Sequence, residues 1–375
     1  MRRTAVQHRV DDALVAVCRG EQPFLGEEPG AAEDFVSAAR YHRIAPLAHV
    51  AVRGSRPDVA DALRDDRSQA LINHLRTTAL LASVAGTLEG IRWLAFKGPI
   101  LSEFAHPIPG LRFYKDLDLL VGPGEFREAC NRLFDAGWQL LLGDDSLESA
   151  EFPGEIALGD PHGVVMDLHW SMVVMKSVRS RFQVTADALL DRRVPVTIGP
   201  AQLYALAPAD ALVHVCQHAA LIGATKLGHV LDADQLARQV DDWDELVERA
   251  AQWGASIQVA AVLGRAQRLL DTPVPAGLDA RLGVGPGMRR LLVGVDSQWP
   301  IQSLRQDASW VRLVTRALRP GLAGTAATIA GRAANGVAHR LRPAPPRSPR
   351  VAASPAVVDA YLARVEAVGA AGYGA

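Results

Sequence analysis

Residues 112–121, RFYKDLDLLV, place Asp116 and Asp118 two positions apart at the start of an apolar run. In a β-strand, side chains at positions i and i+2 point to the same face, with α-carbons about 6.6 Å apart. Two carboxylates on one face can bind a divalent cation, or two cations about 3.5–4 Å apart. Leu117 and Leu119 would then point to the opposite face, into a core. The spacing predicts a strand that carries two metal ligands.

A third carboxylate, Asp167, interrupts a second short apolar run, GVVMDLHW at residues 163–170. Two unit charges about 4 Å apart repel by about 4 kcal/mol at an effective dielectric constant near 20, so clustered carboxylates need a cation. A metal ion would meet that need. The alternative is that Arg112 and Lys115 pair with the first two aspartates as ordinary surface ion pairs.

Upstream of these aspartates, an apolar run at residues 93–96 is followed by Lys97-Gly98-Pro99. Proline suits the first position of a helix, where its missing N–H would have no partner anyway. The sequence therefore predicts a helix that begins at this turn and ends near residue 105. The helix N-terminus and the Lys97 side chain would both favour a phosphate group. The alternative is an ordinary turn between a strand and a helix.

Taken in order, these motifs resemble the uncharacterised nucleotidyltransferase family of the DNA polymerase β-like superfamily. Members of that family carry a Lys-Gly turn, then an arginine and Asp-x-Asp-Leu-Leu-Val, then Asp-Leu-His-Trp. The resemblance is best over about residues 85–200. The matching motifs are Lys97-Gly98, Arg112, Asp116-Leu-Asp118-Leu-Leu-Val121 and Asp167-Leu-His169-Trp170. Nucleotidyltransferases of well-defined activity usually have Gly-Ser or Gly-Gly at this turn, where this chain has Gly98-Pro99, and Pro99 removes one backbone donor for phosphate.

The resemblance implies an enzyme that transfers a nucleoside monophosphate from a nucleoside triphosphate such as ATP to an unidentified acceptor. The acceptor would be a small molecule, a peptide or a protein. Three residues would be catalytic and would bind one or two magnesium ions: Asp116, Asp118 and Asp167. Four residues would bind the nucleotide: Lys97, Gly98, Arg112 and His169. The alternative is a catalytically inactive module that keeps the fold and binds or regulates a protein partner.

Composition narrows the class of protein. The 375 residues have a formal net charge of −1, which provides no overall field for holding nucleic acid, so nucleic acid is not expected as a partner. Cys18, Cys130 and Cys216 have no metal-binding or redox spacing and are expected to be reduced thiols. No stretch approaches the roughly 20 apolar residues needed to cross a bilayer, and the first residues lack the apolar segment of a signal peptide. A cytoplasmic protein that does not span a membrane is expected.

The predicted fold class is α+β, with a small mixed β-sheet core flanked by N- and C-terminal helical regions. Periodic apolar residues predict a helix over 70–82 in the first region. The core is predicted to contain strands at 91–97, 114–121, 138–142 and 155–159, a strand around Asp167, and helices at 99–105 and 124–136. The predicted division is a helical region at 1–90, a nucleotidyltransferase-like core at 91–200, a helical region at 201–307 and a basic, partly flexible Ala/Gly/Pro-rich tail at 308–375. The tail includes a predicted linker at 342–350.

Polar residues in the C-terminal helical region leave two further questions open. His214 and His218 share a helix face, but no third ligand is evident, so packing or substrate contact is favoured over zinc. Asp232 and Asp234 would either line the acceptor side of a cleft or be exposed charges at a helix start. The glycine-rich residues 283–287 follow no predicted strand and are expected to form a loop, not a dinucleotide site.

Overall fold

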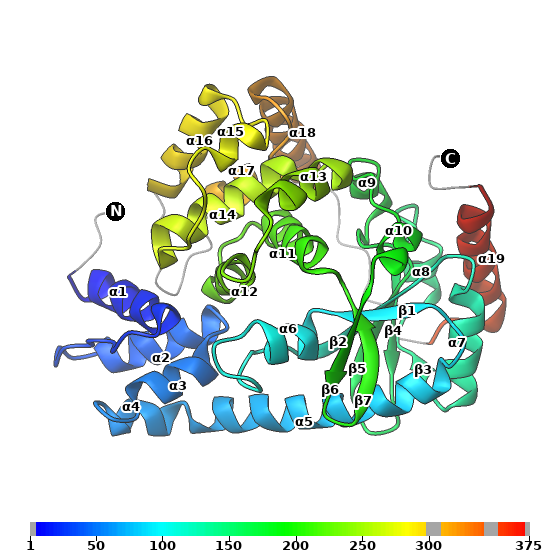
Figure 1. Cartoon of the computed structure of the whole chain (residues 1–375), viewed down its shortest axis with the longest axis horizontal. Coiled ribbons are helices and arrows are strands. Elements are labelled where there is room, and N and C mark those ends of the chain that lie inside the picture. Colours follow the sequence, from blue (N-terminus) through cyan, green and yellow to red (C-terminus); the bar gives the residue numbers. More distant parts are fainter. Residues whose placement is uncertain (1–4, 298–308, 341–351, 372–375) are drawn as a thin grey trace.

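A mixed β-sheet of seven strands lies at the centre of the computed structural model, which describes residues 5–297, 309–340 and 352–371 (Figure 1). The strands are β1 (Trp93–Phe96), β2 (Asp116–Val121), β3 (Gln139–Leu140), β4 (Glu155–Gly159), β5 (Val165–His169), β6 (Val194–Ile198) and β7 (Ala201–Ala205). Their order in the sheet is β3-β4-β5-β2-β1-β7-β6. β2 is parallel to β5 and β1 is parallel to β7, whereas the other neighbours are antiparallel. The register places Asp118 directly beside Asp167.

Both faces of the sheet are buried, and β2 shows why. Leu117 and Leu119 are fully buried in an apolar cluster with the helix α5 (Arg64–Thr87). The alternation of aspartate and leucine along the strand predicts this. Leu120, two positions after Asp118, belongs to a second cluster on the opposite face. Helices on both sides therefore exclude water from the strand that carries the aspartates, and Figure 1 shows α5 on one side and the later helices on the other.

The N-terminal helices form a unit beside the sheet. They are α1 (Ala5–Arg19), α2 (Ala31–Tyr41), α3 (Ala45–Val52), α4 (Pro57–Ala62) and α5. The helix predicted over 70–82 lies within α5, which confirms the prediction. Apolar side chains of α1 to α4 pack with Leu227 and Leu270 of the C-terminal region, so the two helical regions meet across one end of the sheet.

Short helices connect the strands. They are α6 (Gly98–Phe104), α7 (Phe126–Asp135), α8 (Asp144–Leu147), α9 (Lys176–Arg179) and α10 (Ala186–Asp191). α6 begins at the predicted Gly-Pro turn, and α7 buries Phe126, Cys130 and Leu133 on the face that the sequence predicts. β4 and β5 form the predicted hairpin. Its turn has Gly163 at φ 82°, a conformation that suits glycine, and the Oδ1 atom of Asp160 accepts a hydrogen bond from the Val164 amide at 2.6 Å.

Helices follow β7, in agreement with the predicted C-terminal helical flank, but those within residues 309–371 lie in the segment predicted to be a basic, partly flexible tail. The helices are α11 (Pro208–Ile222), α12 (Leu227–Ala237), α13 (Trp243–Trp253), α14 (Ser256–Leu270), α15 (Leu278–Arg281), α16 (Pro286–Ser297), α17 (Ser309–Ala317), α18 (Leu322–Arg340) and α19 (Pro355–Ala371). The loop predicted at 283–287 is shorter than expected, because α16 already begins at Pro286 in the position that favours proline.

The last described helix, α19, packs against the sheet region far from it in sequence. Figure 1 shows α19 beside α7. Tyr361, Leu362 and Val365 are buried in the same apolar cluster as residues of α7 and β5. The Tyr361 hydroxyl donates to the Pro153 carbonyl at 2.7 Å and accepts from Nε1 of Trp170 at 2.8 Å. This helix lies in the segment predicted to be a basic, partly flexible tail. The predicted linker at 342–350 lies outside the described residues.

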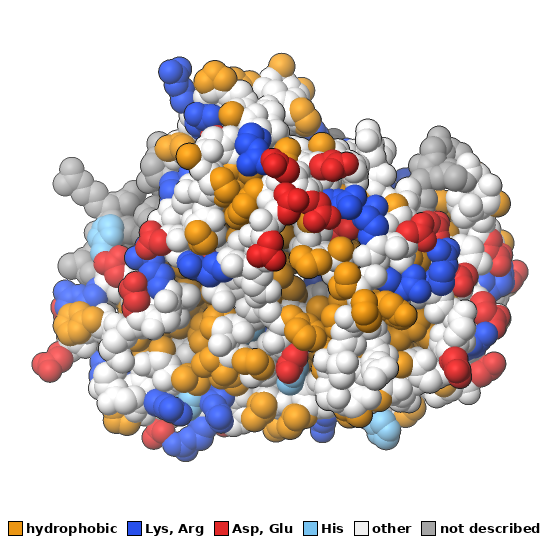
Figure 2. Space-filling view, in the orientation of Figure 1, with side chains coloured by type: hydrophobic (Ala, Val, Ile, Leu, Met, Phe, Trp, Pro, Cys, Tyr) orange, Lys and Arg blue, Asp and Glu red, His pale blue; other side chains and the backbone are white. Residues whose placement is uncertain are grey.

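Two further features bear on the expectations from composition. Cys18, Cys130 and Cys216 are buried and form no disulfide. Among the described residues, the helices are too short or too polar to span a membrane. Figure 2 shows basic and acidic side chains interspersed over the visible face, in keeping with the formal net charge of −1.

Candidate functional site

A cleft of about 360 Å³ lies where β2 and β5 meet the helices α6, α11 and α12. All seven residues to which the sequence assigns a role line this one cleft, although they come from the β1–α6 turn, the loop before β2, and two strands. They are Lys97, Gly98, Arg112, Asp116, Asp118, Asp167 and His169. The parallel pairing of β2 with β5 brings the aspartates together across about 50 residues of sequence, which the motif spacing alone could not show.

Asp118 is the most buried of the three aspartates, with 4% of its surface exposed. Its Oδ1 atom lies 2.8 Å from Nζ of Lys97 and 3.3 Å from Nε2 of His169. Burial by itself would raise the pKa of Asp118, but the Lys97 ammonium and His169 together hold that pKa well below its usual value. Asp118 is therefore an ionised carboxylate with cationic partners in the metal-free protein.

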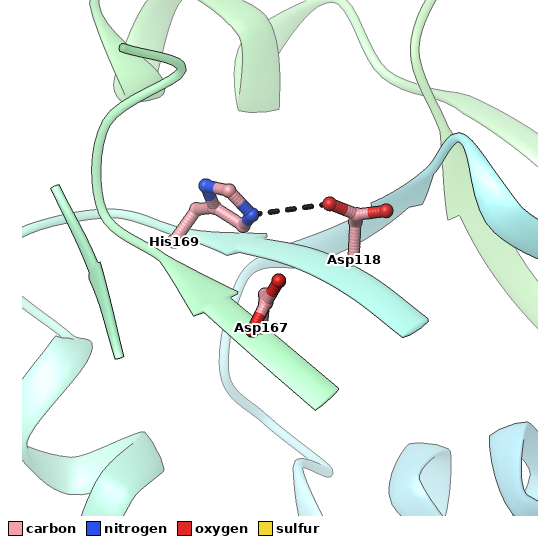
Figure 3. A group of neighbouring side chains, drawn as sticks. All are labelled: Asp118, Asp167 and His169. Atoms are coloured by element: carbon pink, nitrogen blue, oxygen red, sulfur yellow. Dashed lines mark hydrogen bonds and ion pairs between the residues drawn. The ribbon is translucent and has the colours of Figure 1, made fainter. Parts of the chain in front are cut away.

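Asp118, Asp167 and His169 form a tight group of potential metal ligands (Figure 3). One ligand atom from each residue lies within 4.8 Å of the others, and Figure 3 shows the three side chains on the same side of neighbouring strands. The Asp167 side chain makes no hydrogen bond or ion pair with the described part of the chain, so its carboxylate is free to bind a ligand. Burial and the nearby Glu155 carboxylate raise the pKa of Asp167 to about 7. Two carboxylates and an imidazole are a donor set that fits a divalent cation.

Asp116 lies outside this tight group but lines the same cleft. Burial and the charge of Asp118 raise the pKa of Asp116, as expected for carboxylates brought close together. The ligand set predicted from the sequence was Asp116, Asp118 and Asp167. The closest set in the structure contains His169 in place of Asp116, and Asp116 lines the cleft beside it.

His169 is held between two carboxylates. Its Nδ1 atom lies 3.1 Å from Oε2 of Glu155, which is close enough for an ion pair but lacks hydrogen-bond geometry. Burial disfavours the charged imidazolium, yet Glu155 and Asp118 together raise the pKa of His169. Glu155 lines the cleft and was missed in the sequence. The signal that could have identified it is the hairpin register, which pairs Glu155 with His169.

The turn that carries Lys97 has an unusual backbone. Lys97 has φ 55° and ψ −141°, a region in which non-glycine residues are strained, and such strain is often found at functional sites. At Gly98 the backbone φ is 32°, and an added Cβ atom would lie 3.1 Å from the carbonyl oxygen of Asp116. Gly98 therefore permits the close approach of the turn to β2 that places the Lys97 ammonium on Asp118.

Arg112 has a different partner from the one considered in the sequence. Its guanidinium makes two hydrogen bonds to the Asp232 carboxylate, at 2.8 and 2.7 Å. The idea that Arg112 and Lys115 pair with the Asp-x-Asp motif at the surface is thus wrong for Asp118, which is buried and paired with Lys97. The idea of exposed charges on α12 is also wrong, because Asp232 and Asp234 are 6% and 1% exposed. Asp232 lines the cleft and ties α12 to the loop before β2.

Three further histidines line one wall of the cleft: His214, His218 and His229. The first two share a face of α11, as predicted, and the third comes from α12. The centroid of the His218 ring lies 6.0 Å from that of His214 and 5.9 Å from that of His229. The His214 ring also lies 5.1 Å from that of Phe96, which itself contacts His169. We call these three residues the imidazole wall.

A group of cationic and aromatic side chains at the cleft was also missed in the sequence. The Cζ atom of Arg43 and the Nζ atom of Lys115 each lie 5.8 Å from the ring centroid of Phe113. All three residues line the cleft. Arg43 belongs to the connection between α2 and α3, far from every motif, so only the fold brings it here. An aromatic ring beside two cations can contact a nucleobase and phosphate groups.

Comparison with known proteins agrees with the motifs. A family model described as an uncharacterised nucleotidyltransferase matches residues 28–271, which is more than half of the chain. The matched range contains the whole sheet, the cleft residues and the helices α11 and α12 that close it. No curated protein matches the chain.

Proposed function

The chain belongs to the uncharacterised nucleotidyltransferase family, and we propose that it transfers a nucleoside monophosphate from a nucleoside triphosphate to a hydroxyl group of a small acceptor. The observation that carries this proposal is the group of Asp118, Asp167 and His169, with Asp116 beside it, in one partly enclosed cleft. Carboxylates gathered in this way suit metal-assisted phosphoryl transfer.

In this reaction the acceptor oxygen attacks the α-phosphorus atom. A new bond forms between that oxygen and phosphorus, the bond from the α-phosphorus to the oxygen that bridges to the β-phosphate breaks, and pyrophosphate leaves. The hydroxyl proton must move to a base. Asp167 suits that task, because its side chain has no hydrogen-bond partner among the described residues and its pKa of about 7 allows it to take up a proton near neutral pH.

Other cleft residues would bind the metal ions or the triphosphate. Asp116 and Asp118 would hold one or two divalent cations, which magnesium would supply and which would neutralise the triphosphate and polarise the reacting phosphate. Lys97, Arg43 and Lys115 add positive charge around the triphosphate, and Gly98 lets the backbone approach it. Arg112 is fully engaged with Asp232, so we assign it to shaping the cleft more than to direct phosphate binding.

The acceptor is proposed to be small because the formal net charge of −1 does not favour a polyanion, and charges of both signs are interspersed over the face shown in Figure 2. The cleft volume of about 360 Å³ also lies within the range of small-molecule sites.

Pyrophosphate release tests this proposal. The protein is incubated with magnesium and each of the four α-³²P-labelled nucleoside triphosphates, with and without a protein-free metabolite extract. Wild type should release pyrophosphate and form a labelled product that depends on the extract. Asp118→Asn should abolish both, whereas Asp241→Asn, a change of the same type at an exposed position, should not. No extract-dependent product with any triphosphate would instead favour the non-catalytic module, and equal turnover in Asp118→Asn would show that Asp118 is not part of the active site.

A further inference from the structure

The imidazole wall contains hydrogen-bonding groups that the protein itself leaves unused. His214 is 2% exposed, and neither of its ring nitrogens has a hydrogen-bond partner among the described residues. A buried hydrogen-bonding group without a partner destabilises the protein, so such a group in a cleft marks a place where a ligand can supply the partner. His214 faces the cleft beside the metal-binding group, because its ring contacts Phe96 and Phe96 contacts His169.

His229 has a ring nitrogen, Nδ1, that must be a hydrogen-bond donor and that also has no partner among the described residues. Its Nε2 atom lies 3.4 Å from Nη1 of Arg43, and because arginine can only donate, Nε2 must accept. The proton of the neutral ring is then on Nδ1, which is buried and has no partner among the residues that the structure describes. His229 therefore offers a hydrogen-bond donor, whereas the neutral His214 ring offers one donor and one acceptor.

The wall carries no net charge at neutral pH. Burial lowers the pKa of all three histidines, to about 3 for His229, and the Lys97 ammonium adds to this effect at His214 and His218. The cleft surface beside the wall is apolar and comes from Met172, Val174, Val215 and Ile222. A charged acceptor group would lose its hydration at this apolar surface, and the nearby Arg43 and Asp232 side chains are already engaged with His229 and Arg112.

From this geometry we infer that the imidazole wall is the acceptor subsite and that it binds an uncharged, polyhydroxylated small molecule, a sugar or a polyol. Each hydroxyl group both donates and accepts a hydrogen bond, which matches the donor and acceptor of a neutral imidazole. Three rings about 6 Å apart in a row match several hydroxyl groups on one molecule. The end of the row near Phe96 would hold the reacting hydroxyl beside Asp118 and Asp167. This inference rests on the proposed nucleotidyl transfer.

Matched probes test the charge preference. Transfer of the labelled nucleotide is measured with glucose, glucose 6-phosphate and glucosamine as acceptors, and binding of each sugar is followed by saturation-transfer NMR with magnesium and a non-hydrolysable nucleotide analogue. The uncharged sugar should bind and be labelled best. Preference for the phosphorylated or the amino sugar, or no binding of any of them, would overturn the inference.

Variants of His218 test whether the wall is responsible. His218→Leu should reduce transfer to glucose at a sub-saturating concentration about tenfold, as expected for the loss of a hydrogen bond in a desolvated site. His218→Gln keeps a donor and an acceptor and should restore most of that loss. The matched control is His162→Leu in the exposed hairpin turn, which should behave as wild type. Equal transfer in wild type and His218→Leu would overturn the assignment of the wall.

The two proposals fail in different ways. If wild type binds the nucleotide with magnesium but neither binds nor labels a sugar, the acceptor inference is wrong and the proposed nucleotidyl transfer stands. If wild type binds no nucleotide, the proposed function itself is wrong, and the acceptor inference is wrong with it.

Discussion

Nζ of Lys97 lies 2.8 Å from Oδ1 of Asp118, so the carboxylate that is best placed to bind a metal ion already has a cation beside it. Both side chains are largely buried, with 17% and 5% of their surfaces exposed. The pair is formed by a turn with strained backbone at Lys97 and close packing at Gly98. The protein thus contains its own counter-ion for Asp118.

Lys97→Met should destabilise the protein by about 3 kcal/mol, because it leaves Asp118 buried without its main cation. Magnesium should then raise the melting temperature of this variant more than that of wild type, since the metal ion takes over the role of the ammonium. Thermal unfolding with and without magnesium measures both effects. Lys176→Met, an exposed lysine, is the control. If magnesium raised the melting temperature of wild type and Lys97→Met by the same amount, the result would argue against a magnesium ion bound at Asp118.

The Arg112–Asp232 pair should be a stabilising link between the loop before β2 and α12. Asp232→Asn should cost about 3 kcal/mol, because it leaves a buried guanidinium unpaired, whereas the double change Arg112→Met/Asp232→Leu should cost less than the single change. Denaturant unfolding measures these free energies. The control is Asp66→Asn in an exposed ion pair with Arg40, for which a change below about 1 kcal/mol is expected. The account would be contradicted if the double variant lost as much free energy of unfolding as Arg112→Met and Asp232→Leu lose together when each is made alone.

The neutral state of His229 predicts a pH dependence of stability. Its pKa is about 3 in the folded protein, against about 6.5 in an unfolded chain, so between these pH values only the unfolded chain binds the proton. Stability from this group is present above pH 6.5 and is lost as the pH falls, by about 2 kcal/mol at pH 5.

His229→Gln should remove this contribution. The free energies of unfolding of wild type and His229→Gln are compared from pH 7 to pH 5, and the difference between them should change in favour of the variant as the pH falls. The neighbouring Arg43 and Asp232 charges are the same in both proteins, so they affect both curves. A difference that stays constant with pH would show that His229 has the same pKa in the folded protein as in the unfolded chain, which would contradict the account.

Tyr361 should contribute to stability through its hydroxyl. Tyr361→Phe removes the bonds to Pro153 and Trp170 and should destabilise the protein by about 1–2 kcal/mol, while Nε1 of Trp170 keeps its own bond to Pro153 at 3.1 Å. Denaturant unfolding measures the change. Tyr204→Phe, at an exposed position on β7, should have almost no effect. No loss of stability in Tyr361→Phe would mean that α19 does not hold the β4–β5 region in solution.

The sequence predicts the central part of this fold because local patterns determine it. The alternation of aspartate and leucine over residues 116–119 identifies β2. The turn at residues 160–163 identifies the β4–β5 hairpin, and the Gly98-Pro99 turn identifies the start of α6. Each of these patterns depends on neighbours in the chain. The same patterns identify the seven proposed site residues that the structure brings to one cleft.

What the sequence did not predict depends on contacts between distant segments. β7 joins the sheet beside β1, and Arg43 and His229 meet at the cleft although they are 186 residues apart. Tyr361 and Trp170 are 191 residues apart. Residues so far apart in sequence leave no motif with a fixed spacing, so only the three-dimensional structure shows that they are in contact. For the same reason the sequence could not show that Arg112 pairs with Asp232.

Magnesium-dependent nucleotide binding tests the central claim most directly. Each nucleoside triphosphate is titrated calorimetrically into wild type, Asp116→Asn/Asp118→Asn and the control Asp241→Asn, with and without magnesium. The account predicts that at least one triphosphate binds wild type and the control only with magnesium, and that the double variant loses this binding while its unfolding transition remains cooperative. Magnesium-dependent binding that persists unchanged in the double variant, or no binding of any triphosphate to wild type, would contradict it.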